Sequence, residues 1–479
     1  MISATNEQYT SRWRHSQYTS CWRHSQYTSR WRNKGEKSRL ARFLWSLLNT
    51  ITEITPKDGS MNMNKRVVIT GMGVISPIGN TIESFKEALF AGKCGITKLE
   101  LPESDDNRGI AISVAGQVKD FRPEDYGLTP SDIRRSDRFT HFALAATHQA
   151  MAESGLKVGE NISEEMLGVY IGSGIGGLDT FVTQTKNMVE NGAKMVSPLL
   201  IPMMIANIGG ANVAIRYGAK GPCLTTISAC ATGTNAIGEA FYAIQRGDAD
   251  AIIAGGSEAA INPVAIGGFQ NARALTKETN PALACLPFDE RRGGFVMAEG
   301  AGVMILEEYE HAKARGAHII AEICGYGHTC DAHHVTAPDP EGKPAARAMR
   351  KALDQAGYQA GEQLYINAHG TGTHFNDLSE TTAIKIALGE EDAHKAMISS
   401  TKSMTGHMIG AAGAVEAIVC ALALQNDMVP PTIGLTQQDP ACDLDYTPLH
   451  ARKAHLDIAL SNSLGFGGHN ASVVLRKCE

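Results

Sequence analysis

Short apolar runs that end in glycine alternate with longer amphipathic stretches from residue 65 onward. The apolar runs at 65–73, 167–172 and 249–259 predict β-strands, whereas 84–92 and 231–247 predict helices. An apolar run without polar alternation is typical of a strand that is covered on both faces of its sheet. Strands that alternate with helices therefore predict an α/β fold with a largely parallel sheet.

The same order of elements recurs in the second half of the chain. The run at 319–327 resembles the run that opens the first series, and 364–370 again ends a strand in glycine. The segment 397–422 has the strand, the turn and the small-residue helix that also surround Cys230. Two similar halves predict one layered body, in which equivalent strand ends meet at a shared site.

The N-terminal segment has a different character. Polar, basic units recur there and are marked by Trp13, Trp22 and Trp31, and such low-complexity sequence cannot build a core. An Arg-rich, acid-poor segment is compatible with organelle targeting or a membrane surface. We favour an extension outside the working protein, because Met61 or Met63 directly precedes the first convincing strand. We therefore expect three regions, namely a disordered extension and the two halves of a folded body: 1–62, 63–318 and 319–479.

Composition and charge exclude several classes of protein. The 479 residues are 43% hydrophobic, which is enough for one large core or two fused ones. Beyond the basic N-terminal segment the chain is acidic, which argues against nucleic acid as the main partner. The ten cysteines form no CxxC pair, which is typical of a reducing cytosol. No apolar run is long enough for a transmembrane helix, so we expect a cytoplasmic protein, or an organellar one if the extension is a targeting segment.

Cys230 is the strongest candidate nucleophile. It follows the run TTIS at 225–228, which predicts a β-strand, and it precedes a helix. Its neighbours Ala229, Ala231 and Gly233 are small enough for a bulky substrate to approach. A thiol at a helix N-terminus lies at the positive end of the helix dipole, which lowers its pKa. The alternative is a buried, inert cysteine, which is the usual state of a free cysteine.

His369 and His407 are the candidate partners of this thiol. Each follows a strand end and has Gly or Thr neighbours, and we expect His407 in the first turn of a helix. A lone histidine is more often structural. Two histidines at equivalent positions of two halves, with Cys230 at a third such position, are a sharper signal of a catalytic site. No HExxH motif or other metal-ligand spacing is present, so we expect no metal.

Glycines also flank Phe466, in the segment NSLGFGGHN at 462–470. Flexible backbone of this kind can turn main-chain N–H groups toward a ligand, as an oxyanion hole requires. An ordinary glycine-rich turn fits the same sequence equally well, so this segment is informative only together with the candidates above.

Four segments together resemble a known family. In chain order they are TISACATGTNAIG, YINAHGTGT, SSTKSMTGH and SNSLGFGG, and they are similar to the β-ketoacyl-[acyl carrier protein] synthases, above all the elongating type II enzymes. The resemblance covers nearly everything from Lys65 to the C-terminus. It implies the thiolase-like fold, a five-layer αβαβα sandwich of two fused similar halves, in a homodimer. It also implies no cofactor, because both substrates are carried on the phosphopantetheine arm of an acyl carrier protein.

The resemblance also implies the reaction, a decarboxylative Claisen condensation that elongates a fatty acid. Cys230 carries the acyl chain as a thioester, and His369 and His407 hold the malonyl thioester carbonyl. The main-chain N–H groups of Cys230 and Phe466 bind the tetrahedral oxyanion, and Lys402 tunes the local charge. The other matched positions support this machinery or line the acyl and pantetheine channels: Asp377, Glu380 and Glu416 as supporting acids, Ile175 as the gate of the acyl pocket with Phe269 beside it, and Thr336, Thr371 and Thr373 along the pantetheine arm.

Single positions separate this chain from related enzymes. Priming synthases of the family carry Asn where His407 stands, and chain-length-factor subunits lack the nucleophile. Both comparisons favour an active elongating enzyme. His374 stands where many relatives carry proline, and we interpret it as a loop substitution near the site.

Binding of an acidic carrier protein requires a local basic patch on this acidic body. Arg134 and Arg138 are four residues apart on an expected helix and would share a face, with Arg135 beside them. Arg273 lies on an expected loop. These four arginines are the predicted docking residues, and the alternative is a solvated charged face balanced by nearby aspartates.

Three other functions compete with this interpretation. A nicotinamide-dependent dehydrogenase would explain GSGIGG at 172–177, but no acidic residue stands at the end of a second strand about twenty positions later. A non-catalytic carrier-binding subunit would not need the nucleophile. A ketosynthase of a polyketide or specialised lipid pathway shares the motifs, and the lack of fused acyltransferase or carrier domains favours the discrete fatty-acid enzyme.

Overall fold

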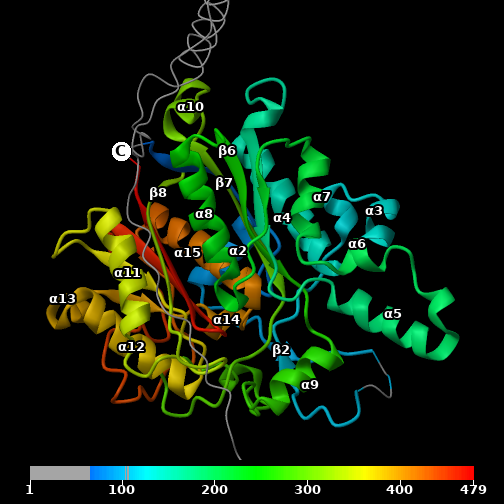
Figure 1. Cartoon of the computed structure of the whole chain (residues 1–479). Coiled ribbons are helices and arrows are strands. Elements are labelled where there is room, and N and C mark those ends of the chain that lie inside the picture. The colour runs from blue at the N-terminus through cyan, green and yellow to red at the C-terminus, as the bar shows by residue number, and fades with distance from the viewer. Residues whose placement is uncertain (1–64, 103, 105–106, 479) are drawn as a thin grey trace, which may run out of the picture. The chain divides into compact units, whose positions relative to one another are not determined.

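The computed structural model describes residues 65–102, 104 and 107–478, and the extension predicted at 1–62 lies outside these residues. Within the described part, ten strands form one sheet (Figure 1). The strands of the first half are β1 (Val67–Ile75), β4 (Leu167–Gly172), β5 (Cys223–Leu224), β6 (Ala251–Glu258) and β7 (Gly300–Glu308). Those of the second half are β8 (Ala321–Cys330), β9 (Leu364–Asn367), β10 (Met397–Ser399), β13 (Ile458–Gly465) and β14 (His469–Arg476).

The two halves place their strands in the same order. Across the sheet, the first half runs β1-β7-β6-β4-β5 and the second runs β8-β14-β13-β9-β10. In each half this is the first, fifth, fourth, second and third strand along the chain. The halves join where Val67–Ile69 of β1 pairs with β8, and the boundary predicted after residue 318 falls between α10 (Tyr309–Ala314) and β8. The predicted fold of two similar halves is confirmed.

The prediction of a largely parallel sheet is wrong, because the sheet is mixed. Parallel pairing is confined to β4 with β5 and β6, and to β9 with β10 and β13. The other five pairings are antiparallel. A tight turn at 466–468 joins β13 to β14, and such a turn connects only antiparallel strands. Strands that are buried on both faces have the same apolar pattern in either direction, so the pattern could not show this.

Helices α8 (Thr232–Arg246) and α15 (Ala412–Asn426) form the middle layer of the described part (Figure 1). α8 contacts β4 and β6 of the first half and β8 and β14 of the second, and α15 likewise contacts strands of both halves. α4 (Arg138–Ser154) covers the outer face of the first half-sheet, and α11 (Lys343–Gln355) covers that of the second. The resulting αβαβα order is the predicted five-layer sandwich.

Shorter elements surround this body. Two small sheets pair β2 (Thr97–Lys98) with β3 (Val114–Ala115) and β11 (Met428–Val429) with β12 (Arg452–Lys453). The other helices are α2 (Ile82–Phe90), α3 (Pro130–Arg135), α5 (Leu178–Asn191), α6 (Leu200–Met204), α7 (Ile208–Tyr217), α9 (Pro263–Asn271), α12 (His374–Leu388), α13 (Glu390–Lys395) and α14 (Lys402–Thr405). His374 therefore opens a helix and is not in a loop as predicted. Proline is favoured at that helix position, which accounts for the residue of many relatives there.

The apolar composition of α15 follows from its place in the core. Among the described residues, the segment Ile409–Asn426 is the one helix long and apolar enough to cross a membrane, and 89% of that segment is buried inside the protein. A helix that is apolar on all sides is typical of the centre of a large protein. Packing between the two half-sheets is thus sufficient to explain it.

Candidate active site

Cys230 lies in a single 3-10 turn, Ala229–Ala231, that leads into α8. The strand predicted directly before it is wrong. β5 ends at Leu224, and the hydroxyls of Thr225 and Thr226 donate to main-chain carbonyls at 3.0 and 3.1 Å. Ala229, the first residue of the turn, has a φ of 50°. This left-handed conformation is strained for any residue other than glycine and is frequent at functional sites. The nucleophile candidate therefore follows a sharp, strained bend.

The chain after β13 approaches the Cys230 backbone closely. A Cβ atom on Gly465 would lie 2.9 Å from the Ser228 carbonyl oxygen and 3.2 Å from the Cys230 nitrogen, so a side chain at 465 would crowd the turn. The main-chain N–H of Phe466 lies close enough to Cys230 to lower the pKa of its thiol. Two main-chain N–H groups, those of Cys230 and Phe466, thus lie beside the thiol, where the oxyanion of a tetrahedral intermediate would form.

His369 follows β9 in a loop that two buried acids hold in place. Glu380 accepts hydrogen bonds from the main-chain N–H groups of His369 and Gly370, both at 2.7 Å. Asp377 accepts one from the N–H of Gly372 at 3.3 Å. Neither acid lines the cavity described below. Their contacts match the supporting role that the resemblance implies, because they fix the backbone that carries the imidazole.

His407 lies in the turn between α14 and a second 3-10 turn, Ile409–Ala411, and not in the first turn of a helix as predicted. Main-chain hydrogen bonds of 2.7 and 2.9 Å to the segment 296–298 anchor it. His369 and His407 thus both belong to the second half, at different positions. The predicted equivalence of the two histidines across the halves is wrong.

The three predicted catalytic side chains meet at one place. The sulfur of Cys230 and a ring nitrogen of each histidine lie within 4.8 Å of one another. The ring centroids of His369 and His407 are 5.2 Å apart, with the ring planes at 85°. Within the described residues, His369 Nδ1 and both ring nitrogens of His407 are buried without a hydrogen-bond partner. Leaving a buried polar atom without a hydrogen bond costs about 1–3 kcal/mol of stability. We therefore expect these nitrogens to form hydrogen bonds with a bound substrate.

Both imidazoles are neutral near pH 7. Burial lowers the pKa of His369 and of His407 well below the usual range, and the nearby charge of Lys402 lowers both further. A neutral imidazole has one N–H donor and one acceptor nitrogen. Two such rings at one position offer two donors to a single oxygen that gains negative charge.

The same three groups are also one of two clusters with metal-ligand geometry among the described residues. The other cluster, Glu390, His394 and Asp443, is exposed. Sequence spacing could not reveal the first cluster, because its members are far apart along the chain. The positive charge of Lys402, which acts on both imidazoles, would also repel a divalent cation. That the protein needs no metal stays a prediction.

The three side chains line a cavity of about 440 Å³, a size typical of small-molecule sites. Phe269 and Phe466 stand in its wall with ring centroids 6.3 Å apart. All of the predicted substrate-contacting residues line the same cavity: Ile175, Phe269, Thr336, Thr371, Thr373 and Phe466. Segments from both halves thus enclose one space beside the thiol.

Lys402 and Glu416 form a buried ion pair outside the cavity wall. Lys402 Nζ donates to Glu416 Oε1, and the two side chains are 1% and 3% exposed. Burial raises the pKa of Glu416 to about 7, and the charge of Lys402 lowers it in part. Lys402 does not line the cavity, so it acts on the thiol and the imidazoles through its charge rather than by contact.

The predicted fall in the pKa of Cys230 is wrong for the unliganded site. Burial raises the pKa of the Cys230 thiol to about 11, and the charge of Lys402 and the N–H of Phe466 lower it only in part. The thiol is therefore protonated at neutral pH. Its proton must leave during acyl transfer.

Alkylation of Cys230 is expected to accelerate with pH. Below its pKa, the thiolate fraction of a thiol rises about tenfold for each unit of pH, and the thiolate is the reactive form. Peptide mass mapping after short iodoacetamide pulses between about pH 7 and about pH 9 measures this rate, with the exposed Cys330 as an internal comparison. A rate at Cys230 that is already constant near pH 7 would contradict the raised pKa.

The predicted docking arginines do not share one helix face. α3 ends at Arg135, and α4 begins at Arg138, so Arg134 and Arg138 lie on different helices. Arg134 and Arg135 are exposed. Arg138 donates two hydrogen bonds to Glu299 at 2.9 and 3.0 Å, so its charge is already balanced inside the protein. Extended backbone at Ser136 breaks the expected helix, which the charge pattern alone did not indicate.

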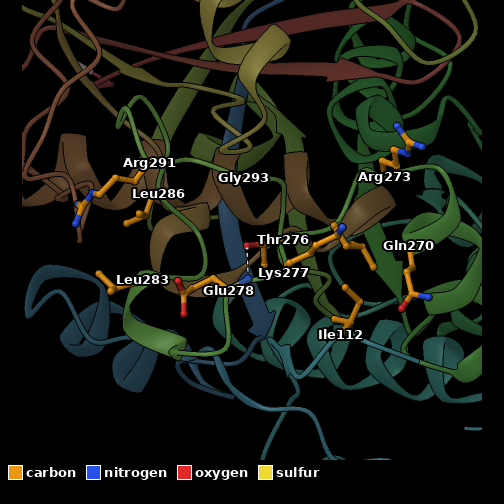
Figure 2. Close-up of a pocket in the computed structure, with 11 residues that line it drawn as sticks. Ile112, Gln270, Arg273, Thr276, Lys277, Glu278, Leu283, Leu286, Arg291 and Gly293 are labelled. Carbon is orange, nitrogen blue, oxygen red and sulfur yellow. Dashed lines mark hydrogen bonds between the residues drawn. The ribbon is translucent and has the colours of Figure 1, made fainter. Parts of the chain in front are cut away.

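Arg273 lies between the cavity and a second pocket of about 530 Å³. Figure 2 shows Arg273 and Gln270 on one side of this second pocket, Arg291 on the other and Lys277 between them. Arg291 is paired with Asp289 at 2.8 Å, whereas Arg273 and Lys277 are exposed. Of these two exposed cations, only Arg273 also lines the cavity.

Several residues of the cavity wall were not predicted. They are spread over the chain and include Phe295, Asp331, Phe375, Ile409 and Asn470. Phe375 lies two residues after the YINAHGTGT motif, and Asn470 ends the segment around Phe466, so a wider reading of those motifs could have found them. Nothing in the local pattern around Phe295 or Asp331 indicates a site.

Comparisons with known proteins agree with this geometry. A profile of the beta-ketoacyl synthase N-terminal domain matches residues 64–312, and a profile of the C-terminal domain matches 320–436. The chain belongs to the beta-ketoacyl synthase family. It is 49% identical over 419 residues to 3-oxoacyl-[acyl-carrier-protein] synthase 2 of Staphylococcus aureus, which covers 88% of this chain and 100% of that relative. The same enzyme of Synechocystis sp. is 48% identical over 416 residues, 87% of this chain and 99% of the relative.

This chain also resembles solved structures of ketosynthases. A ketosynthase of a type II polyketide system, solved in complex with its acyl carrier protein, superposes with a TM-score of 0.79 and 36% identity, covering 87% of this chain and 100% of that one. The predicted family, fold class and enzyme class are therefore confirmed. Membership of this family removes the dehydrogenase hypothesis.

Proposed function

We propose that this beta-ketoacyl synthase is an elongating 3-oxoacyl-[acyl carrier protein] synthase, which adds two carbons to an acyl chain held on Cys230. The convergence of Cys230, His369 and His407 at one cavity carries the proposal. It also argues against a non-catalytic subunit, because the nucleophile and both histidines are present together.

The first half-reaction is acyl transfer. The Cys230 sulfur attacks the thioester carbonyl of the acyl carrier substrate, and the N–H groups of Cys230 and Phe466 stabilise the oxyanion. The intermediate collapses by breaking the bond to the carrier sulfur. The proton from Cys230 ends on that leaving thiolate, so the products are the Cys230 thioester and the free carrier thiol.

The second half-reaction is decarboxylation and condensation. The malonyl thioester oxygen accepts hydrogen bonds from His369 and His407, which stabilise the enolate as carbon dioxide leaves. The enolate carbon attacks the Cys230 thioester. The oxyanion again forms beside the N–H groups of Cys230 and Phe466, and its collapse expels the Cys230 thiolate, which takes up a proton from solvent to restore the thiol. Neutral rings suit this task, since each offers an N–H without competing charge.

A direct assay tests this function. The purified protein, incubated with an acyl carrier protein loaded with a saturated acyl group and another loaded with malonate, is expected to release carbon dioxide and form the 3-oxoacyl carrier that is two carbons longer. Mass spectrometry of the carrier arm reads the product. Acylation of Cys230 without any longer product would contradict the proposed reaction.

A polyketide or specialised lipid pathway is the second candidate. The solved polyketide ketosynthase is 36% identical to this chain, whereas the curated 3-oxoacyl synthases reach 49%. The higher identity over a similar span favours fatty-acid elongation. Successive condensations on one chain without reduction of the new keto group would instead favour a polyketide role.

We propose an acyl carrier protein as the partner, docked at Arg273, with Arg134 and Arg135 as a second contact. Replacing Arg273 with alanine is expected to raise KM for the carrier-bound acyl substrate by up to about fivefold and to leave kcat unchanged, because an exposed ion pair contributes at most about 1 kcal/mol. The effect should shrink as salt screens the charges. Lys157→Ala, an exposed lysine on another part of the surface, is the matched control. An unchanged KM at low salt would remove Arg273 from the interface.

We also propose a homodimer that forms through the edge strand β5. β5 ends the sheet, so its outer edge has no partner strand among the described residues. Leu224 and Ile227 beside that edge are 48% and 58% exposed, and further apolar side chains on α5, α6 and α7 are exposed as well. Exposed apolar surface at a sheet edge favours association. Sedimentation equilibrium should show twice the chain mass, and Ile227→Asp should lower it to that of one chain.

We further propose that the enzyme needs no cofactor of its own and works in the cytoplasm, with an organelle as the alternative. The phosphopantetheine arm of the carrier would bring both substrates, and the cavity threonines would contact it. Full activity of protein that has been treated with a chelator and desalted would support this, and loss of activity under that treatment would contradict it.

A further inference from the structure

A buried glutamate outside the predicted site connects two segments of the cavity wall. Glu258 ends β6 and is fully buried. Its Oε1 accepts hydrogen bonds from Ser173 Oγ at 2.9 Å and from the Ile175 N–H at 3.3 Å. Its Oε2 accepts from the N–H groups of Gly174 at 2.9 Å and Gly410 at 3.0 Å. One carboxylate thus binds four donors from two halves of the protein.

Both segments belong to the site. Gly174 and Ile175 follow β4 and line the cavity, and Ile409 lines it from the second half. The two segments touch, because a Cβ atom on Gly410 would lie 2.4 Å from the Gly174 nitrogen and 2.9 Å from Glu258 Oε2. Only glycines let the backbones approach so closely with the carboxylate between them.

The two halves have equivalent turns, and this equivalence explains why the N–H of Gly410 can bind Glu258. The turn Ile409–Ala411 leads into α15 as the turn Ala229–Ala231 leads into α8, and their first residues have φ values of 47° and 50°. Gly410 is therefore the counterpart of Cys230. The Cys230 N–H lies beside the thiol, whereas the Gly410 N–H is bound to Glu258. The second turn thus holds a neighbouring loop instead of forming a second reaction centre.

We infer that Glu258 is a positioning residue that holds Ile175 over the acyl channel by tying residues 173–175 to the turn at 409–411. This inference rests on the proposed function, because it requires that the acyl chain enter past Ile175. On this inference, a long chain has to displace Ile175, whereas a short chain fits without doing so. The carboxylate therefore sets the discrimination between long and short chains.

The variant Glu258→Gln tests this role, because it replaces one carboxylate oxygen with an NH2 group and changes little else. With its NH2 group toward Gly174 and Gly410, two N–H donors would face another donor, which is unfavourable. With the NH2 group toward Ser173, the serine hydroxyl can rotate and accept from it. Among the main-chain donors only the Ile175 N–H then loses its partner. The variant should therefore keep the fold and release Ile175.

The measurement compares acylation of Cys230 by palmitoyl and hexanoyl carrier protein, followed by intact-mass spectrometry. In Glu258→Gln the ratio of the palmitoyl rate to the hexanoyl rate is expected to rise about tenfold over wild type, the size of effect that loss of one hydrogen bond to a charged group produces. Ser173→Ala, which leaves the Ile175 hydrogen bond in place, should change the ratio less than about twofold. In an Ile175→Ala background, the glutamine variant should cause no further rise, because the gate is already absent.

The possible outcomes distinguish a failure of this inference from a failure of the proposed function. A wild-type protein that gains no acyl mass from either carrier would overturn the proposed function. An acylated wild type and a folded Glu258→Gln variant with the same ratio would overturn the inference alone. Should the glutamine variant fail to fold, Glu258→Asp keeps the charge but cannot reach both segments, and the same rise is expected of it. An additive effect of Glu258→Gln and Ile175→Ala would also overturn the inference, because it would mean that Glu258 acts elsewhere.

Discussion

Replacing Cys230 with alanine is expected to abolish the covalent acyl-enzyme completely. The side chain provides the sulfur of the thioester, and no other described cysteine lies with both histidines at the cavity. Intact-mass spectrometry after incubation with acyl carrier protein should show the acyl mass on the wild type and none on the variant. Elongation should fall to the uncatalysed background, since the first half-reaction has no alternative acceptor.

Cys330→Ala is the matched control. Cys330 is an exposed cysteine whose thiol lies 3.7 Å from the Gly467 carbonyl oxygen, close to the segment that carries Phe466, but it does not line the cavity. Its replacement should leave acylation intact. If the acyl mass persists on Cys230→Ala or disappears from Cys330→Ala, the assignment of Cys230 as the nucleophile is wrong. The proposed mechanism would then have no basis.

Replacing either His369 or His407 with alanine is expected to preserve acyl transfer but to slow malonyl decarboxylation by about 100- to 1,000-fold. Loss of one preorganised donor to a developing oxyanion typically costs that factor. The two donors act on one oxygen, so the double variant should lose less than the product of the single effects. Release of labelled carbon dioxide from malonyl carrier protein measures the second step, and intact mass measures the first.

His374→Ala provides the control for these variants. Its imidazole is exposed, and its Nδ1 lies 3.3 Å from Arg292, outside the cavity wall. It should decarboxylate malonate at the wild-type rate. Normal decarboxylation in both His369→Ala and His407→Ala would refute the role of the two rings, whereas loss of acyl transfer in either would move that residue into the first half-reaction.

The main residues of the site could be read from the sequence because each lies in a distinctive local pattern. Cys230 has small neighbours at a helix start, and His369, His407 and Phe466 lie among glycines and threonines after strands. Their convergence was an expectation from the repeat of the halves and from the family resemblance. The structure places three of these side chains within 4.8 Å, although more than a hundred residues separate Cys230 from His369.

Electrostatic properties were less predictable than residue identity. The helix position of Cys230 favoured a lowered pKa, but burial raises the pKa to about 11. The size of that effect depends on how much protein surrounds the sulfur, which is a property of the packed core. The charge of Arg138 was likewise assigned to a docking surface, and the fold pairs it with Glu299 from a distant segment.

The sequence by itself determined the two-half architecture, the family, and the residues that can serve as nucleophile and hydrogen-bond donors, because these depend on local patterns and motifs. Only the tertiary structure decided the strand directions, the neutral state of the imidazoles, the raised pKa of Cys230 and the bridge that Glu258 forms to Gly410. Each of these depends on contacts between segments far apart in the chain. A linear pattern carries no information on which buried donors and charges will finally share one low-dielectric space.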